Sequence, residues 1–279
     1  MGQAVALLAP VGVATALASW GNAEQQARYL TAFAQDEPPD AAMALLEPGA
    51  VGDPSQPGAR AEKDGESWLL TGEKTLVPLG RFANLLIVSA DVEGLGPRLL
   101  IIETSSTGVS CEAEAGMGLR SASLGRICLQ GVRVHPQQIL GDEAALQDAI
   151  HLGRMAWCAL AVGTAQAVLD LVGPYTNERK AFGEPISHRQ AVAFLVANIA
   201  IETDAMRLML WRALSRYEQG LSWHREAVLA HRFCSEHAMQ LGSDGVQLLG
   251  GHGFVKEYPV ERWYRDLRAV GIMEGGLLL

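Results

Sequence analysis

One carboxylate near the end of the sequence has the neighbours that a general base needs. Glu274 lies between Met273 and the glycine pair Gly275-Gly276. Apolar surroundings disfavour the charged form of a carboxylate and raise its pKa toward neutral pH, which suits it to remove a proton from carbon. The glycines would let the backbone pass close to a ligand. On these few residues alone, a surface glutamate in a glycine turn is the simpler interpretation.

Two other segments could bind a phosphate. Arg179 lies in the sequence Glu-Arg-Lys-Ala-Phe-Gly over residues 178–183, and a guanidinium matches the geometry of phosphate oxygens. Gln247 precedes a glycine cluster over residues 250–253. The alternatives are a solvated basic helix end for the first segment and glycines that stop a helix for the second.

Taken in order, these segments resemble the C-terminal signature of the acyl-CoA dehydrogenase flavoprotein family. The resemblance runs from Gly245 to Gly276 and includes the glycine cluster, Tyr-Pro-Val-Glu-Arg at 258–262, Arg265-Asp266 and Glu274. Upstream motifs extend it over nearly the whole chain; they are Glu47-Pro48-Gly49, Thr71-Gly72-Glu73-Lys74 and Gly118-Leu119-Arg120-Ser121.

The resemblance implies a role for each candidate residue. Glu274 would be the catalytic base, which removes the proton alpha to the carbonyl of an acyl-CoA thioester. Residues of the two phosphate-binding segments would hold FAD shared with a neighbouring subunit; they are Arg179, Phe182, Gln247, Gly250, Gly251 and Gly253. Arg154 would orient Glu274 or its loop, although a surface salt bridge is an equal alternative. Ser121 would lie beside flavin and substrate, unless its loop is only a turn into a strand.

The hydrophobic patterns predict an α+β multidomain fold. Short segments rich in Leu, Ile and Val indicate strands of a small antiparallel barrel or sandwich at 67–74, 84–91, 98–104 and 126–134. Helices are predicted from 1 to about 35 and at 154–180, 190–219 and 226–249, the last three as an up-and-down bundle. With the resemblance, we predict three domains: 1–38, a remnant of an N-terminal helical domain; 39–141, a β-rich middle domain; and 142–279, a C-terminal helical bundle.

Composition limits the partners. The net charge of -9 gives no support to a nucleic-acid or anionic-membrane partner. The four cysteines are widely spaced, so we expect no metal site and buried free thiols in a reducing cytoplasm. The apolar first twenty residues lack the positive charge that precedes the apolar stretch of a signal peptide, and Pro10 would interrupt a spanning helix. We therefore expect a cytoplasmic protein.

The sequence departs from the family where the flavin ring would lie. Leu46 stands where the family usually has Thr, and Val51-Gly52 where it has Gly-Ser. Leu76 and Pro78 replace an aromatic residue and a Thr or Ser near flavin N5, and proline has no N–H to donate. Further changes are Ala181 and Gly276, both at common Thr positions. Each lost hydrogen bond costs about 0.5–1.5 kcal/mol, so the departures predict weakened FAD binding.

The resemblance implies an FAD-dependent acyl-CoA dehydrogenase that forms a 2-enoyl thioester in fatty acid metabolism. Its electrons would pass to an electron-transfer flavoprotein or a similar acceptor, and its subunits would form dimers or tetramers. The first alternative is a non-catalytic partner subunit or fragment with a degraded flavin site. The second is a related flavoenzyme that oxidises an acyl-carrier-protein thioester or another acyl group.

Overall fold

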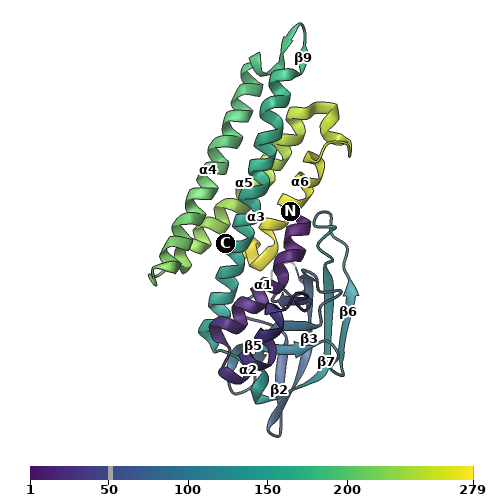
Figure 1. Cartoon of the computed structure of the whole chain (residues 1–279), viewed down its shortest axis with the longest axis vertical. Coiled ribbons are helices and arrows are strands. Elements are labelled where there is room, and N and C mark those ends of the chain that lie inside the picture. Colours follow the sequence, from purple (N-terminus) through teal and green to yellow (C-terminus); the bar gives the residue numbers. More distant parts are fainter. Residues whose placement is uncertain (50–52, 279) are drawn as a thin grey trace. The chain divides into compact units, whose positions relative to one another are not determined.

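The computed structural model describes residues 1–49 and 53–278, and it shows the backbone but not the side chains of residues 276–278 (Figure 1). The chain packs as two compact units, which consist essentially of Gly2–Gly153 and Arg154–Leu277. Helix α3 (Glu143–Glu178) begins in the first unit and ends in the second. The predicted three domains differ from this two-way division, and their boundaries stay predictions.

The first unit is built on an eight-stranded sheet with the order β6-β7-β3-β2-β4-β5-β8, to which β1 adds by pairing with β4. The strands are β1 (Ala41–Ala44), β2 (Arg60–Asp64), β3 (Ser67–Val77), β4 (Leu85–Val92), β5 (Gly96–Glu103), β6 (Val109–Ala113), β7 (Gly125–Val134) and β8 (Ile139–Leu140). The four predicted strands are confirmed as β3, β4, β5 and β7.

The sheet is mixed, whereas the sequence predicted an antiparallel barrel or sandwich. Strand β4 pairs in parallel with both β1 and β2, while the other pairings are antiparallel. Parallel neighbours need long connections rather than hairpins, and β1 and β2 do not precede β4 directly in the chain. Strand β4 lies between β2 and β5 in the sheet order, and almost all of its residues are buried.

Helix α1 (Gly2–Trp20) covers one face of this sheet. Its Val13 and Leu17 pack with Leu85 and Ile87 of β4 in one apolar cluster. Helix α2 (Ala23–Tyr29) follows and continues into a 3-10 turn, η1 (Leu30–Ala34). The predicted N-terminal helical region is thus confirmed, with a break where Asn22 caps the start of α2 by accepting a hydrogen bond from the Gln25 backbone.

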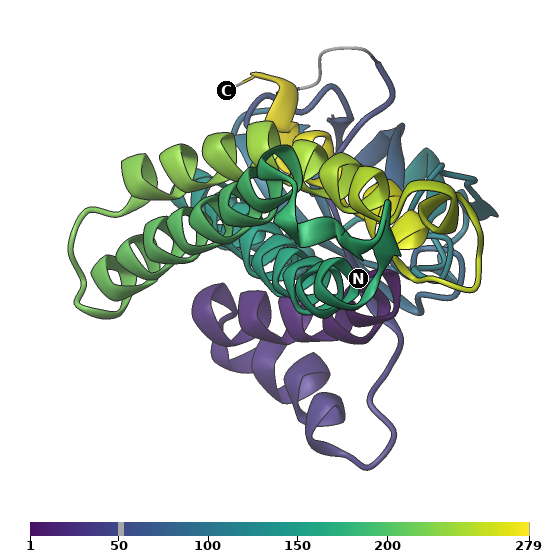
Figure 2. The same ribbon diagram turned by 90° about the horizontal axis from the view of Figure 1, so that it is seen from above.

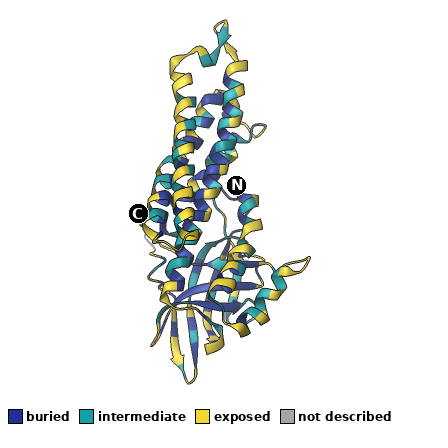
Figure 3. Ribbon diagram, turned by 60° about the vertical axis from the view of Figure 1, so that its left-hand side comes forward, coloured by how far each residue is buried: buried dark blue, intermediate teal, exposed yellow. Residues whose placement is uncertain are grey.

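The second unit contains the remainder of α3 with α4 (Gln190–Glu218) and α5 (His224–Leu249), which run side by side (Figure 2). A small hairpin of β9 (Lys180–Ala181) and β10 (Glu184–Pro185) and a 3-10 turn, η3 (Ile186–His188), join α3 to α4. Buried and exposed residues alternate along these helices, so each has a packed side and a solvent side (Figure 3). The three predicted helices are confirmed, and α3 starts eleven residues before the predicted 154.

After α5 the chain turns through short helices to its end. They are η4 (Gly250–Phe254), α6 (Val260–Leu267), η5 (Arg268–Gly271) and η6 (Met273–Leu278). Pro259 immediately precedes α6, as its fixed φ and missing N–H favour at a helix start. Small residues of α5 allow this segment to approach closely: a Cβ at Gly242 would lie 2.8 Å from the Cα of Tyr264.

Helices α1 and α3 have the length and hydropathy of membrane spans, with 28% and 50% of their most apolar windows buried in the protein. Core helices of soluble proteins have the same properties, so these two helices do not decide between the possibilities. The expected absence of a membrane partner stays a prediction.

A buried ion pair joins two of the sequence motifs in the first unit. The side chain of Lys74 is fully buried, and its Nζ lies 2.6 Å from Glu47 Oε1 and 2.9 Å from Ser89 Oγ. Glu47 also accepts hydrogen bonds from the backbone of Gly58 and Ala59. Burial lowers the pKa of Lys74 to about 8, against the opposing effect of Glu47. Removal of one partner would leave the other buried and uncompensated.

We therefore predict that Glu47→Gln lowers the free energy of unfolding by about 3–5 kcal/mol, measured by chemical denaturation. Asp64→Asn is the matched control, because its pair with Arg133 is half exposed and such pairs contribute under about 1 kcal/mol. The double variant Glu47→Gln/Lys74→Met should recover part of the loss. Equal losses for Glu47→Gln and Asp64→Asn would contradict a structural role for the pair.

Candidate functional site

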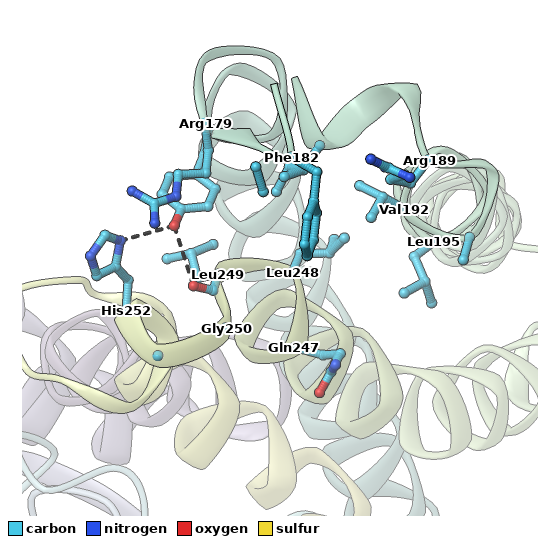
Figure 4. Close-up of a pocket in the computed structure, with 15 residues that line it drawn as sticks. Arg179, Phe182, Arg189, Val192, Leu195, Gln247, Leu248, Leu249, Gly250 and His252 are labelled. Carbon is cyan, nitrogen blue, oxygen red and sulfur yellow. Dashed lines mark hydrogen bonds between the residues drawn. The ribbon is translucent and has the colours of Figure 1, made fainter. Parts of the chain in front are cut away.

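The second unit contains a pocket of about 610 Å³ between the β9–β10 hairpin, the start of α4 and the end of α5 (Figure 4). The pocket brings together five of the six residues that the resemblance assigns to FAD: Arg179, Phe182, Gln247, Gly250 and Gly251. The sixth, Gly253, does not line it. Gly253 is buried, and a Cβ there would lie 2.2 Å from the carbonyl oxygen of Val246, so packing alone requires glycine.

The pocket has cationic and aromatic walls. Arg179 follows the last residue of α3, and Arg189 lies across the pocket at the start of α4, where it pairs with Glu184 at 3.1 Å. Phe182 has φ of 55° and 95% of its surface exposed, and the Arg189 guanidinium carbon lies 5.6 Å from its ring centre. Tyr175 is hydrogen-bonded to His252 Nδ1 at 2.9 Å. These groups suit a ligand with both a phosphate and a flat ring.

Glu274 lies in the same unit, as a half-buried residue in a strained turn. Its φ of 48° is left-handed, a conformation that non-glycine residues rarely adopt, and Gly275 continues it with φ of 73°. Its Oε2 is buried without a hydrogen-bond partner. Arg154 Nε donates to the backbone carbonyl oxygen of Glu274 at 3.1 Å, so the two predicted partners do meet.

The electrostatics of Glu274 suit a base near neutral pH. Burial raises the pKa of its carboxyl to about 7, against the opposing effects of the Arg154 charge and of a hydrogen bond from the Trp157 side chain. Neither Trp157 nor its position was among the sequence predictions. The spacing of three residues between Arg154 and Trp157, which places both on one face of a helix, was a signal that could have identified it.

A buried histidine close to Arg154 was also missed. His231 of α5 is fully buried, and neither ring nitrogen has a hydrogen-bond partner. Burial and the Arg154 charge lower the pKa of this imidazole to about 4. The nearby Val270 carbonyl favours the protonated imidazole and so opposes this decrease, although it makes no hydrogen bond to the ring. His231 follows Ala227 by four residues on the apolar face of α5, and that position could have indicated its burial.

The flavin-side predictions fall in the first unit. Ser121 is exposed in the loop before β7, which contains the positive-φ residues Leu119 and Ser123. The backbone N–H of Leu76 already donates to Glu114 Oε2 at 2.6 Å, and Pro78 has none. Val51 and Gly52 lie outside the described residues. The donor at 76 is therefore engaged within the protein.

All four cysteines are free; Cys158 and Cys234 are buried, whereas Cys111 and Cys128 are only half-buried, contrary to the expectation that all would be buried. Both exceptions lie on strands β6 and β7 at the end of the sheet order. Within residues 1–49 and 53–278, no three His, Cys, Asp or Glu side chains gather as metal ligands would.

Comparison with known proteins identifies the family. Residues 42–132 match the middle domain of acyl-CoA dehydrogenase, and residues 143–276 match its C-terminal domain. The chain is 33% identical over 264 residues to a 3-(aryl)acrylate reductase of Clostridium sporogenes. It is 29% identical over 266 residues to the mitochondrial short-chain specific acyl-CoA dehydrogenase of Mus musculus. The chain belongs to the acyl-CoA dehydrogenase family.

A solved structure supports the same conclusion about the fold. The butyryl-CoA dehydrogenase of Megasphaera elsdenii superposes with a TM-score of 0.90 at 27% identity, over 99% of this chain and 75% of that one. The match to the Clostridium protein includes 91% of this chain and 70% of that protein. The match to the mouse protein includes 92% of this chain and 64% of that protein. The predicted family and fold class are confirmed, with the sheet mixed rather than antiparallel.

The raised pKa of Glu274 predicts a pH-dependent stability. Between the unfolded value of 4.5 and the folded value of about 7, the folded state binds more protons, so its stability falls as pH rises. From pH 5 to 8, Glu274→Gln should gain about 2–3 kcal/mol in free energy of unfolding relative to the unsubstituted protein. His231 titrates in both proteins and cancels from this difference.

The control is Glu257→Gln, which changes an exposed glutamate in the same unit. Urea denaturation at several pH values measures all three proteins. A parallel pH dependence in Glu274→Gln and the unsubstituted protein would show that the carboxyl is not buried as described.

Proposed function

We propose that this chain is the base-bearing subunit of an FAD-dependent acyl-CoA dehydrogenase that converts an acyl-CoA thioester to the 2-enoyl-CoA. One observation carries the proposal: Glu274 Oε2 is buried and unpartnered in a residue held by Arg154. A buried carboxylate oxygen that has no hydrogen-bond partner keeps its lone pairs available to a substrate proton. Its pKa near 7 keeps a useful fraction ionised at neutral pH.

The chain's own residues would contribute binding and proton transfer. Glu274 would take the α-proton as the C–H bond breaks, and the β-hydrogen would leave as hydride, so that the substrate loses two electrons and two hydrogens. Arg154 would hold the Glu274 backbone and limit the rise in its pKa. When bound, FAD supplies the hydride acceptor.

The residues present fit part of FAD. Arg179 and Gln247 would bind the diphosphate, Phe182 would offer a ring face, and Gly251 leaves open space where a Cβ would otherwise project. By the family resemblance, this pocket would serve the cofactor of a neighbouring subunit. At the flavin-ring side, Leu76 N–H is engaged with Glu114 and Pro78 offers no donor, so we expect weaker binding there.

An apolar face on α4 supports association of subunits. Phe194, Ile201, Leu208 and Trp211 are each at least 59% exposed and recur at helical spacing along that helix. Large exposed side chains in such a row are typical of an interface. We propose a dimer or tetramer in which these faces are covered.

The direction, acceptor and location remain part of the proposal. One relative is the CarC subunit of a caffeyl-CoA reductase-Etf complex, 31% identical, which supports an electron-transfer flavoprotein as partner. The Clostridium sporogenes relative is also a reductase by name, so the direction of the reaction is itself part of the proposal. We write the reaction as the oxidation of a saturated acyl-CoA substrate. A prolyl acyl carrier protein oxidase, 25% identical, keeps carrier-protein thioesters as an alternative. We propose a cytoplasmic protein of fatty acid metabolism.

The engaged donor at Leu76 and the proline at 78 favour a second candidate function. In it, the chain is a partner subunit whose pocket serves the cofactor of a complete subunit, while its own flavin site is not used. Visible absorbance separates the two. A protein that binds added FAD and is bleached by an acyl-CoA is the enzyme, whereas a protein that stays colourless with FAD is the partner.

The first test of the proposal is Glu274→Gln. Loss of the base should lower turnover by at least about 10²-fold, while the FAD content stays unchanged. Glu257→Gln should keep full turnover, because Glu257 is exposed. Loss of bound FAD in Glu274→Gln, with no separate effect on turnover, would point to a structural carboxylate.

The second test is Arg179→Ala. Removal of the guanidinium should weaken FAD retention by about tenfold or more, as expected for a hydrogen bond to a charged group. Arg225→Ala, at an exposed position of α5, is the control. Cofactor content is measured by absorbance and subunit association by light scattering. Unaltered cofactor content in Arg179→Ala would overturn the assignment of the pocket.

A further inference from the structure

Tyr175 of α3 forms hydrogen bonds with two groups at the end of α5. Its hydroxyl oxygen lies 2.9 Å from His252 Nδ1 and 3.3 Å from the carbonyl oxygen of Leu249 (Figure 4). A carbonyl oxygen can only accept a hydrogen bond, and a phenol has a single proton to donate. If Tyr175 donates that proton to Leu249, it must accept the other bond from His252 Nδ1. Both contacts are therefore satisfied together only when the imidazole carries its proton on Nδ1.

The surroundings of Tyr175 favour this arrangement. Leu249 is the last residue of α5, so its carbonyl is one that the helix end leaves without an intrahelical partner. The Tyr175 hydroxyl supplies that partner. The ring of His252 stacks on Tyr258 with ring centres 5.1 Å apart, and the Tyr175 ring meets His252 edge-on at 5.9 Å. The imidazole is thus held in both position and orientation.

A proton on Nδ1 leaves Nε2 as the available nitrogen of His252. In the part of the chain that the structure describes, Nε2 has no hydrogen-bond partner. His252 lines the pocket together with Arg179. The Arg179 backbone N–H donates to the Tyr175 carbonyl oxygen at 2.9 Å, so these two side chains leave the end of α3 on the same face. A protonated Nε2 would add a second cationic donor to the wall that holds Arg179.

We propose that His252 is a further anion-binding residue of this pocket and that Tyr175 is its positioning residue. Tyr175 keeps Nδ1 protonated, and Nε2 takes up a proton when a diphosphate binds, so that the charged imidazole donates to a phosphate oxygen. Imidazole changes its charge between about pH 5 and 8, so the affinity for a diphosphate should fall as pH rises through this range. The identity of that diphosphate as part of FAD rests on the proposed function; the hydrogen bonds of Tyr175 do not.

The acidic groups around His252 leave its positive charge uncompensated. Asp244 accepts a hydrogen bond from Gln240 at 2.7 Å, and Glu261 accepts one from Arg265 at 2.8 Å. Among the described residues, no carboxylate forms an ion pair with His252. The charged and titratable groups on the elements around His252 are Tyr175 and Glu178 of α3; Arg179, Lys180, Glu184, His188 and Arg189 between α3 and α4; Asp244 of α5; Lys256, Glu257 and Tyr258 before α6; and Glu261, Arg262 and Arg265 of α6.

The test is the binding of ADP-ribose, measured by isothermal titration calorimetry at about pH 5.5 and about pH 8. Its diphosphate is esterified on both sides, so its charge is constant over this range, and it carries no flavin ring. The unsubstituted protein should bind it about tenfold more tightly at the lower pH, as expected for a hydrogen bond gained to a charged group. His252→Asn keeps an amide for Tyr175 and removes Nε2, so it should bind with the weaker affinity at both pH values.

The matched control is His224→Asn, at an exposed position at the opposite end of α5. It should keep the tenfold difference between the two pH values. Because His224 and His252 are both exposed, neither substitution removes a core side chain.

Nitrogen NMR of the ligand-free protein tests the role of Tyr175. Ring nitrogens with and without a proton differ in chemical shift, and the signals of His252 are those that His252→Asn removes. Near pH 8, the unsubstituted protein should carry the proton on Nδ1. Tyr175→Phe removes the hydroxyl and keeps the ring, so it should move this proton to Nε2 or divide it between the two nitrogens. A purely structural tyrosine would leave the tautomer unchanged.

Several results would overturn the role of His252. They are a proton on Nε2 in the unsubstituted protein near pH 8, no binding of ADP-ribose, equal affinity at both pH values, and a pH dependence that persists in His252→Asn. Weaker binding in Arg179→Ala with no effect of His252→Asn would overturn this role alone and leave the pocket assignment in place. The proposed dehydrogenase function fails instead if Glu274→Gln leaves turnover unchanged, and none of these binding and NMR measurements depends on turnover.

Discussion

The cost of removing one carboxylate from water governs the arrangement of the second unit. Glu274 is placed in a left-handed turn with one oxygen buried and unpaired, a conformation and an environment that both cost free energy. The surrounding structure offsets this cost with the guanidinium of Arg154 and the donor on Trp157. Since desolvation exceeds these opposing effects, the pKa of Glu274 stays raised. A more strongly paired glutamate would be stable but would have little basicity to offer.

The same balance explains why His231 is buried in its neutral form. A second cation beside Arg154 would shift the carboxylate back toward its ionised form, and an anion would draw Arg154 away from Glu274. The imidazole does neither, because burial and the nearby guanidinium keep it neutral over the pH range where Glu274 titrates. Two buried groups with pKa values pushed apart in this way are characteristic of functional sites. The buried charges of the first unit differ from Glu274, because Lys74 and Glu47 are paired directly with each other, as expected of a structural ion pair.

The sequence was sufficient to predict most of the helices and strands and most of the candidate site residues, but not all of them. Periodicity located the main strands and helices, because their apolar residues must face a core. It could not reveal that β4 is flanked by parallel neighbours, since strand order depends on contacts far apart in sequence. Glu274, Arg154 and the pocket residues came from the family resemblance rather than from spacing. Trp157 and His231 resembled ordinary core residues, and only their packing beside Arg154 gives them significance. Gly253 was assigned to a ligand, although a backbone oxygen already requires glycine there.

The length of α3 has a consequence for how active sites are shared. From Arg154, beside the base, to Glu178, beside the pocket, the helix rises about 36 Å at 1.5 Å per residue. One FAD molecule is too short to reach both ends, so under the proposed function a chain's base and its own pocket serve different cofactors. Each chain would then contribute residues to two active sites, and each active site would need residues from two chains. A chain lacking the base and a chain lacking Arg179 would together assemble one intact site in a mixed dimer.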